Sequence, residues 1–268
     1  MTHMQVPLLK QIPSEAKIRG LIRRTVYGKN LKCPRCGYTG IKRSEDRYRC
    51  PRCRKPFNLL TGTWLAGTKL SYQKLWTLLW CWTQAIPILQ TQKLCGMNEK
   101  TVSHWYREFR LHVPEIQGIL HGQIQMDEAY FKGLALLMAK QIKSQKQLAF
   151  VVVPTTAVDK QLATQFLFQY VQPHSTLQTD GGGIYKQIHT RWPVIHKTDI
   201  HKKFEFGLTS EIEGLFGNLR TFIRRMYHHV RPEYLPEYIS EFCTRFSSPE
   251  IFTSPATYLA KTLLPCSN

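Results

Sequence analysis

The sequence contains two identical Cys-Pro-Arg-Cys units, Cys33 to Cys36 and Cys50 to Cys53, with thirteen residues between them. Four thiolates on two tight turns are the ligand set that a tetrahedral structural Zn²⁺ ion requires. A redox dithiol and a chance pairing are the alternatives, but the repeated spacing is typical of a zinc ribbon. We therefore predict a zinc-dependent module within residues 1–60, because so short a segment buries too little apolar surface to fold unaided.

The chain is strongly basic. It has 37 Lys and Arg residues against 18 Asp and Glu residues, which gives a formal net charge of +19. This balance favours a polyanionic partner, and we expect double-stranded DNA. The apolar content of 43% across 268 residues is enough for a substantial core, which argues against wholesale disorder.

The remaining cysteines and the N-terminal segment indicate in which cellular compartment the protein is expected. The other four cysteines are scattered, which argues against a secreted disulfide framework; they are Cys81, Cys95, Cys243 and Cys266. The N-terminal segment lacks the apolar run of a signal peptide, and no stretch elsewhere is apolar for long enough to span a bilayer. We expect an unexported protein of the cytoplasm, associated with the nucleoid and not with membranes.

Residues 61–115 have the pattern of a helical DNA-binding region. Apolar residues recur with a helical period over 70–86, and Pro87 is expected to end that helix. A short second helix follows over 88–94, and a third begins near Glu99 after a turn that contains Gly96. Two helices joined by a short turn are typical of a helix-turn-helix, although a helical linker with a solvated polar face would have the same pattern.

The third of these helices has an apolar and a polar face. The apolar face, which we expect to be buried, carries Val102, Trp105, Tyr106 and Phe109. The polar face is the one that could enter a DNA major groove, and its predicted DNA contacts are Lys100, Ser103, His104, Arg107 and Arg110.

After Pro114 the apolar period changes from helical to alternating. Strands are predicted over 123–131, 133–140 and 147–153, followed by a helix over 158–171 and a fourth strand over 175–179. More helices follow. This order matches an α/β fold of the RNase H-like type, in which a mixed sheet is flanked by helices, and we assign it to residues 116–268.

Three acidic residues in this region stand where a divalent-metal site would need them. Asp127 lies within an apolar strand, Asp180 ends a strand before three glycines, and Glu213 lies on a helix predicted over 210–226. A charged residue in an apolar strand needs a partner or a metal. The alternatives are that Asp180 is only a turn residue and Glu213 only a surface charge; the nearest competing carboxylates are Glu128, Glu211 and Asp199.

Basic side chains follow the third acidic residue on the same helix. Arg220 lies two helical turns beyond Glu213 and so on nearly the same face, where it could hold a phosphate. Arg224 and Arg225 form part of a basic run that we interpret as a DNA-backbone surface.

These residues resemble a known family. From about residue 15 to residue 250, the chain is similar to insertion-sequence transposases of the IS1595 group, which carry an ISXO2-like DDE domain. The resemblance is carried by the motifs at Asp127–Gly133, Thr179–Gly181, Ile212–Gly214, Tyr227–His229 and Glu241–Phe246. The chain departs from the family pattern at Ser210, Phe216 and Arg220, where the family usually has Asn, Trp and Lys.

The resemblance implies DNA strand cleavage and strand transfer. Two Mg²⁺ or Mn²⁺ ions would be held by Asp127, Asp180 and Glu213, with a basic residue at position 220. The expected partners are the DNA ends of a mobile element and its target, and further copies of the chain bound to the DNA. The alternative function is a non-catalytic, sequence-specific DNA-binding protein with an inactive RNase H-like domain.

Overall fold

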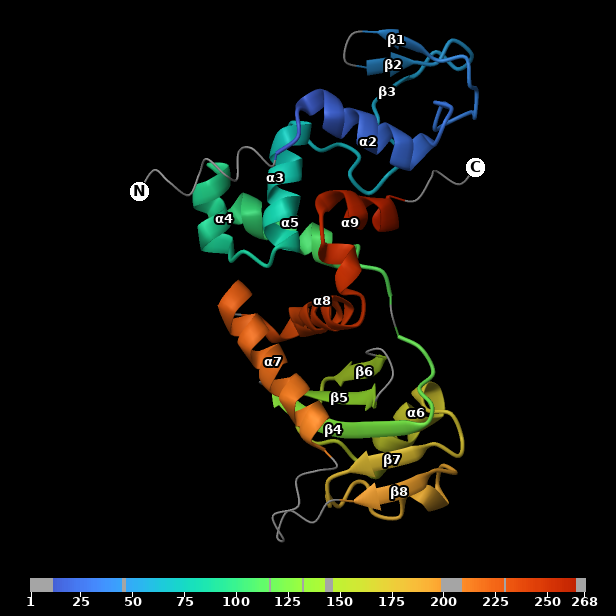
Figure 1. The fold of residues 1–268 in the computed structure, drawn as a ribbon, viewed down its shortest axis with the longest axis vertical. Coiled ribbons are helices and arrows are strands. Elements are labelled where there is room, and N and C mark those ends of the chain that lie inside the picture. The colour runs from blue at the N-terminus through green and yellow to red at the C-terminus, as the bar shows by residue number, and fades with distance from the viewer. Residues whose placement is uncertain are drawn as a thin grey trace. The chain divides into compact units, whose positions relative to one another are not determined.

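The computed structural model describes residues 12–44, 47–115, 117–131, 133–142, 147–198, 209–228 and 230–263. The chain forms two compact units (Figure 1). The first comprises Met1–Pro114 together with Glu250–Asn268, and the second comprises Glu115–Pro249. Among the described residues, no helix combines the length and the apolar character that crossing a membrane requires.

The N-terminal ribbon is a small antiparallel sheet with the strand order β1-β2-β3. Its strands are β1 (Lys42–Ser44), β2 (Arg47–Arg49) and β3 (Pro56–Phe57). The rings of Tyr48 and Phe57 stack with their centroids 5.5 Å apart. Among the described residues, the buried core cluster of this module consists of Phe57 and two of the four cysteines predicted to bind zinc, so its core is very small.

Helices form the rest of the first unit: α2 (Glu15–Tyr27), α3 (Tyr72–Thr83), α4 (Ile88–Cys95), α5 (Glu99–Leu111) and α9 (Pro255–Thr262). The predicted helix over 70–86 is shorter than expected, because α3 ends at Thr83 and Pro87 instead occupies the N-cap position of α4. Gly96 adopts the left-handed conformation after α4, and the Asn98 side chain caps α5 by accepting from Thr101 N.

The segment after the second unit returns to the first. The 3-10 helix η4 (Pro249–Phe252) and α9 bring Phe252 and Tyr258 against Trp82, with ring centroids 5.4 and 5.1 Å from that of Trp82. The Tyr258 hydroxyl donates to the carbonyl oxygen of Phe109 at 2.6 Å. The predicted domain boundary of 116–268 is therefore corrected, since aromatic packing assigns residues 250–263 to the helical unit.

The second unit is built on a five-stranded mixed sheet with the order β6-β5-β4-β7-β8. The pairs β4–β5 and β5–β6 are antiparallel, whereas β4–β7 and β7–β8 are parallel. The strands are β4 (Gln123–Phe131), β5 (Leu134–Gln141), β6 (Leu148–Val153), β7 (Thr176–Thr179) and β8 (Ile195–Thr198). The α/β fold with a mixed sheet is thus confirmed, and β8 is a strand that the sequence pattern did not predict.

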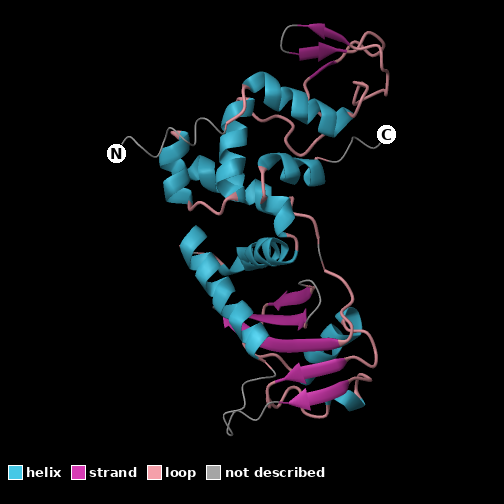
Figure 2. Ribbon diagram, in the orientation of Figure 1, coloured by secondary structure: helices cyan, strands magenta, loops and turns pink. Residues whose placement is uncertain are grey.

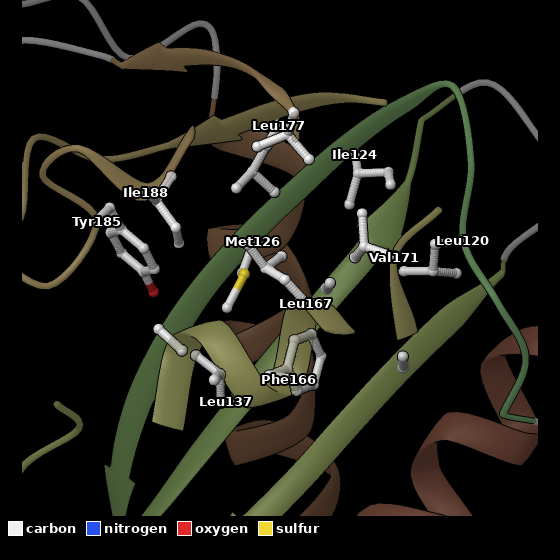
Figure 3. Close-up of a cluster of buried hydrophobic side chains, with 14 of the residues drawn as sticks. Leu120, Ile124, Met126, Leu137, Phe166, Leu167, Val171, Leu177, Tyr185 and Ile188 are labelled. Atoms are coloured by element: carbon white, nitrogen blue, oxygen red, sulfur yellow. The ribbon is translucent and has the colours of Figure 1, made fainter. Parts of the chain in front are cut away.

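Helices cover both faces of this sheet (Figure 2). They are α6 (Lys160–Tyr170), α7 (Ser210–Tyr227) and α8 (Leu235–Ser247), with the 3-10 helices η1 (Ile188–Thr190) and η3 (Pro232–Tyr234). Successive side chains of β4 point to opposite faces of the sheet. Ile124 and Met126 join the core that includes Phe166 of α6 (Figure 3), whereas Ala129 joins the core that includes Ile212 of α7.

Candidate active site and zinc site

The four predicted zinc ligands come together. Their ligand sulfur atoms all lie within 4.8 Å of one another, and two of the separations are 3.7 Å for Cys33–Cys53 and 3.6 Å for Cys36–Cys50. A tetrahedral ion with Zn–S bonds of about 2.3 Å requires sulfur atoms about 3.8 Å apart. The chemistry and the spacing of these four thiols therefore fit a structural Zn²⁺ ion.

The two zinc knuckles have the same backbone geometry. The amide of Gly37 donates to the carbonyl of Cys33 at 2.9 Å, and the amide of Arg54 donates to the carbonyl of Cys50 at the same distance. Both donors have a positive φ, 71° at Gly37 and 59° at Arg54. The left-handed conformation carries no steric cost at the glycine and some cost at the arginine.

Sheet pairing brings the first two acidic residues side by side. In the parallel pair β4–β7, Gln125 is opposite Gln178. Asp127 and Asp180 each lie two residues further along their chains, and Asp180 follows directly after the last residue of β7. Their side chains therefore lie next to each other on adjacent strands, where two carboxylates can share metal ions.

The third acidic residue is positioned by contacts that fix the start of α7 on the sheet. The Ile212 amide donates to Oε1 of Gln125 at 2.9 Å, and Glu211 forms an ion pair with Lys140 of β5. Gln125 and Lys140 are both buried, so these polar contacts join the helix to the interior of the domain. Glu213 follows within the same helical turn, on the side of the sheet that carries Asp127.

Each of the three carboxylates uses one oxygen in a local hydrogen bond. Asp127 Oδ1 accepts from the Glu128 amide at 2.8 Å, Asp180 Oδ1 from the Gly182 amide at 3.0 Å, and Glu213 Oε1 from the Thr209 hydroxyl at 2.8 Å. Within the described part of the chain, the second oxygen of each residue has no hydrogen bond. These bonds fix the orientation of the carboxylates and leave one oxygen of each to bind a cation.

Gly182 shows why glycine follows Asp180. A Cβ atom at position 182 would lie 2.8 Å from Asp180 Oδ1, closer than such atoms approach in proteins. A side chain here would displace the carboxylate that the Gly182 amide now holds. Glycine at position 182 therefore leaves room for the Asp180 carboxylate in the orientation that it has here.

The carboxylates act on one another electrostatically. Burial of Asp127, reinforced by the negative charges of Glu128, Asp180 and Glu213, raises its pKa to about 7. The hydrogen bond from the Glu128 amide offsets only part of this effect. Divalent cations bound between the carboxylates would relieve this repulsion.

The raised pKa of Asp127 predicts a pH dependence of stability in metal-free protein. The folded state holds this proton up to about pH 7, whereas the unfolded state releases it near the model value of 3.8. The free energy of unfolding should therefore fall as the pH rises from about 4 to about 7. Asp127→Asn should remove this component and raise the melting temperature at pH 8 by roughly 5 °C in the presence of EDTA. Parallel pH profiles for the two proteins would contradict the assignment.

Tyr185 is a site residue that sequence reasoning missed. Its buried hydroxyl donates to Glu128 Oε2 at 2.5 Å, and its ring lies beside Ile188 at one end of the core cluster (Figure 3). Glu128 lies on the face of β4 opposite Asp127, as expected. The bond ties the loop after Asp180 to β4, and the signal available in the sequence was a tyrosine five residues after that aspartate.

Removal of the Tyr185 hydroxyl should loosen this loop. We expect Tyr185→Phe to weaken Mn²⁺ binding by about 10- to 100-fold, as loss of a supporting hydrogen bond typically does around metal sites. Titration calorimetry with Mn²⁺ measures the effect directly. Tyr130→Phe, which removes a hydroxyl that contacts the Val158 amide at 3.3 Å, is the matched control and should bind Mn²⁺ like the wild type. Equal affinity in all three proteins would show that the bond to Glu128 has no positioning role.

The basic residues of α7 lie farther along the helix. Arg220 is exposed and its guanidinium carbon lies 5.8 Å from the centroid of the Phe131 ring at the end of β4. Seven residues separate it from Glu213, which corresponds to about 10 Å along the helix axis. Arg224 and Arg225 are exposed on the last turns.

The predicted DNA-contacting face of α5 is only partly as expected. Lys100, His104 and Arg107 are exposed and Ser103 is half-buried, but Arg110 is buried, with 3% of its surface exposed. Arg110 follows Tyr106 by one helical turn, so it lies at the flank of the buried stripe rather than opposite it. It is therefore no longer a candidate for DNA contact.

Trp105 requires a second correction on α5. It is half-buried, whereas the other three residues of the predicted apolar face are fully buried. Its ring stands at an edge of that face, beside His104, with ring centroids 5.5 Å apart.

Two other residues singled out in the sequence, Asp199 and Cys266, lie outside the described residues.

The family described as the ISXO2-like transposase domain matches residues 119–247, which include all three carboxylates and the helices α7 and α8. Residues 119–247 are an ISXO2-like transposase domain. The resemblance seen in the sequence is thus confirmed for this part of the chain. The transposase domain coincides closely with the second structural unit.

The other comparisons add little to this assignment. None of the curated proteins compared with the chain matches it. Among solved structures, one similar chain belongs to the "CryoEM structure of simian T-cell lymphotropic virus intasome in complex with PP2A regulatory subunit B56 gamma". The identity is 12%, the match covers 69% of this chain and 74% of that chain, and the TM-score is 0.37. A likeness at this level carries no argument about function.

Proposed function

We propose that the protein is a DNA transposase that cleaves DNA strands and joins them to a target. The observation that supports this most directly is the convergence of Asp127, Asp180 and Glu213 within the transposase domain, from two neighbouring strands and one helix. Each has one carboxylate oxygen held and one available. Burial, reinforced by repulsion from the neighbouring carboxylates, raises the pKa of Asp127, and divalent cations relieve such repulsion.

The three carboxylates would hold two Mg²⁺ or Mn²⁺ ions. Such ions activate a water or a DNA 3′-hydroxyl for in-line attack on a phosphodiester and stabilise the leaving oxygen. The protein residues keep the carboxylates in place: the Gln125 and Lys140 contacts hold Glu213, and the Tyr185–Glu128 bond holds the loop of Asp180.

The other parts of the chain would bind the DNA. The exposed residues Lys100, His104 and Arg107 of α5 are placed for groove or backbone contact in a helix-turn-helix, and Arg220 would contact a phosphate near the metal ions. The zinc ribbon adds further arginines, and we expect several copies of the chain to act together on two element ends.

Metal-dependent cleavage of the DNA that flanks the gene tests the proposal. The purified protein is incubated with end-labelled flanking segments and a target plasmid in Mg²⁺, Mn²⁺, Ca²⁺ or EDTA. We expect strand cleavage and joined products in Mg²⁺ or Mn²⁺ and none in EDTA. Specific binding without cleavage in either active metal would instead support a non-catalytic DNA-binding protein.

Binding to DNA should depend steeply on salt. Neutralisation of phosphates by Lys and Arg releases counterions, so log K should fall linearly with log salt concentration. Lys100→Ala should reduce the steepness of this slope by about one, and weaken binding to all sequences alike, if its ammonium contacts a phosphate. Lys160→Ala, a control at the first residue of α6, should leave the slope unchanged. Identical slopes for all three proteins would remove Lys100 from the interface.

A further inference from the structure

A cavity of about 310 Å³ lies within the transposase domain, beside the end of β4 and the C-terminal half of α7. Its floor includes Phe131, Ile223 and Leu235, and the guanidinium groups of Arg220 and Arg224 and the imidazole of His228 also line it. The volume falls at the lower end of the range of about 300–1,000 Å³ for small-molecule sites. Neither the three carboxylates nor the residues that position them line it.

The lining specifies the chemistry of a ligand. The guanidinium carbon of Arg220 lies over the Phe131 ring, 5.8 Å from its centroid, so an aromatic surface adjoins a positive charge, and none of the described residues that line the cavity is a carboxylate. A small inorganic anion would leave the apolar floor uncovered. A hydrocarbon would leave Arg220 and Arg224 without an anionic partner. A nucleotide satisfies both, since its base can stack on the ring while its phosphates meet the guanidinium groups.

The distance from the carboxylates indicates where along a DNA strand this nucleotide would lie. Arg220 follows Glu213 by seven residues on α7, which places it about 10 Å along the helix axis. Successive phosphates of one strand advance by about 3.4 Å along a duplex. We propose that the cavity accepts a single nucleobase, unstacked from the DNA strand about three nucleotides from the phosphate at the carboxylates. This inference rests on the proposed function.

An unpaired base should enter the cavity more readily than a paired one. Extraction of a base from a duplex costs a few kcal/mol, and this cost is least where the base is already unpaired. Stacking on an aromatic side chain offsets part of this cost. The protein should therefore prefer DNA with a single unpaired nucleotide, and the preference should depend on the ring of Phe131.

The test uses a duplex that carries one unpaired 2-aminopurine, and a fully paired duplex of the same sequence as reference. In Ca²⁺, the wild-type protein should bind the unpaired form about tenfold more tightly. Binding should also shield the 2-aminopurine from quenching by acrylamide. Phe131→Leu keeps apolar bulk but removes the ring, so it should lose both effects while binding paired DNA normally.

Two further variants complete the experiment. Phe168→Leu is the matched control, because Phe168 lies on α6 of the same domain with 74% of its surface exposed, and it should keep the preference. Arg220→Gln, at an exposed side chain, should weaken the preference even if Phe131→Leu fails to fold. Equal binding of the two duplexes by the wild type, or equal effects of Phe131→Leu and Phe168→Leu, would overturn the inference.

Failure of this inference can be told apart from failure of the proposed function. Metal-dependent cleavage by a protein with no preference for the unpaired base would reject the nucleobase site alone. Shielding of the 2-aminopurine by a protein that never cleaves DNA would keep the nucleobase site and reject the transposase activity.

Discussion

Glu213→Gln should bind DNA ends like the wild type and cleave them slower by orders of magnitude. The substitution removes the negative charge that would hold a divalent cation, and it keeps the side-chain length and an oxygen that can still accept from Thr209. Binding should survive because it depends on α5 and the basic surfaces rather than on the carboxylates. Gel-shift and cleavage assays on the same labelled DNA measure the two effects separately.

The choice of control for Glu213 follows from the structure. Glu211, two residues earlier, pairs with the buried Lys140, so Glu211→Gln would disturb the attachment of α7 as well as the charge. Glu233→Gln is the better control, because this exposed residue makes only a long 3.9 Å contact with Arg231. It should cleave at the wild-type rate. Cleavage by Glu213→Gln at that same rate would show that the third carboxylate has been misassigned.

Cys36→Ser should unfold the N-terminal ribbon and leave the transposase domain folded. The ribbon has a core of one buried ring and two buried cysteines, so zinc must supply most of its folding free energy. Structural zinc in such modules binds with about 10–16 kcal/mol, far more than so small a core can replace. We expect about one Zn²⁺ per wild-type chain and much less than one in the variant.

Metal analysis and limited proteolysis check this expectation together. Proteolysis should cut Cys36→Ser between residues 31 and 57 at protease concentrations that leave the wild type intact. Cys95→Ser makes the same chemical change at a half-buried position of α4 and should retain its zinc. A folded wild-type protein without zinc would remove the ribbon assignment altogether.

The sequence predicted those elements that depend on local patterns. Short apolar runs located β4, β5 and β6, and the helical period located α4 and α5 to within a residue or two. It missed β8, whose four residues are mostly exposed and lack an apolar stripe. An edge strand of this kind forms because a neighbouring strand is available to pair with it, which local composition does not encode.

The same distinction between local patterns and long-range contacts holds for the candidate site. The three carboxylates were found because each lies at a position where a charge is unusual or a turn is sharp, and the family motifs surround them. The contacts that hold them, Gln125 with Ile212 and Tyr185 with Glu128, join residues that are 87 and 57 positions apart. Similarly, a helical wheel of α5 alone did not reveal that Arg110 is buried.

The return of residues 250–263 to the first unit has a consequence for the order of synthesis. The transposase domain is complete as a polypeptide once residue 249 has left the ribosome, whereas Trp82 still lacks the rings of Phe252 and Tyr258. The helices that we propose to read DNA thus reach their final packing only after residues 250–263 have been synthesised. A chain that terminates at residue 249 would carry all three carboxylates on an incomplete helical unit.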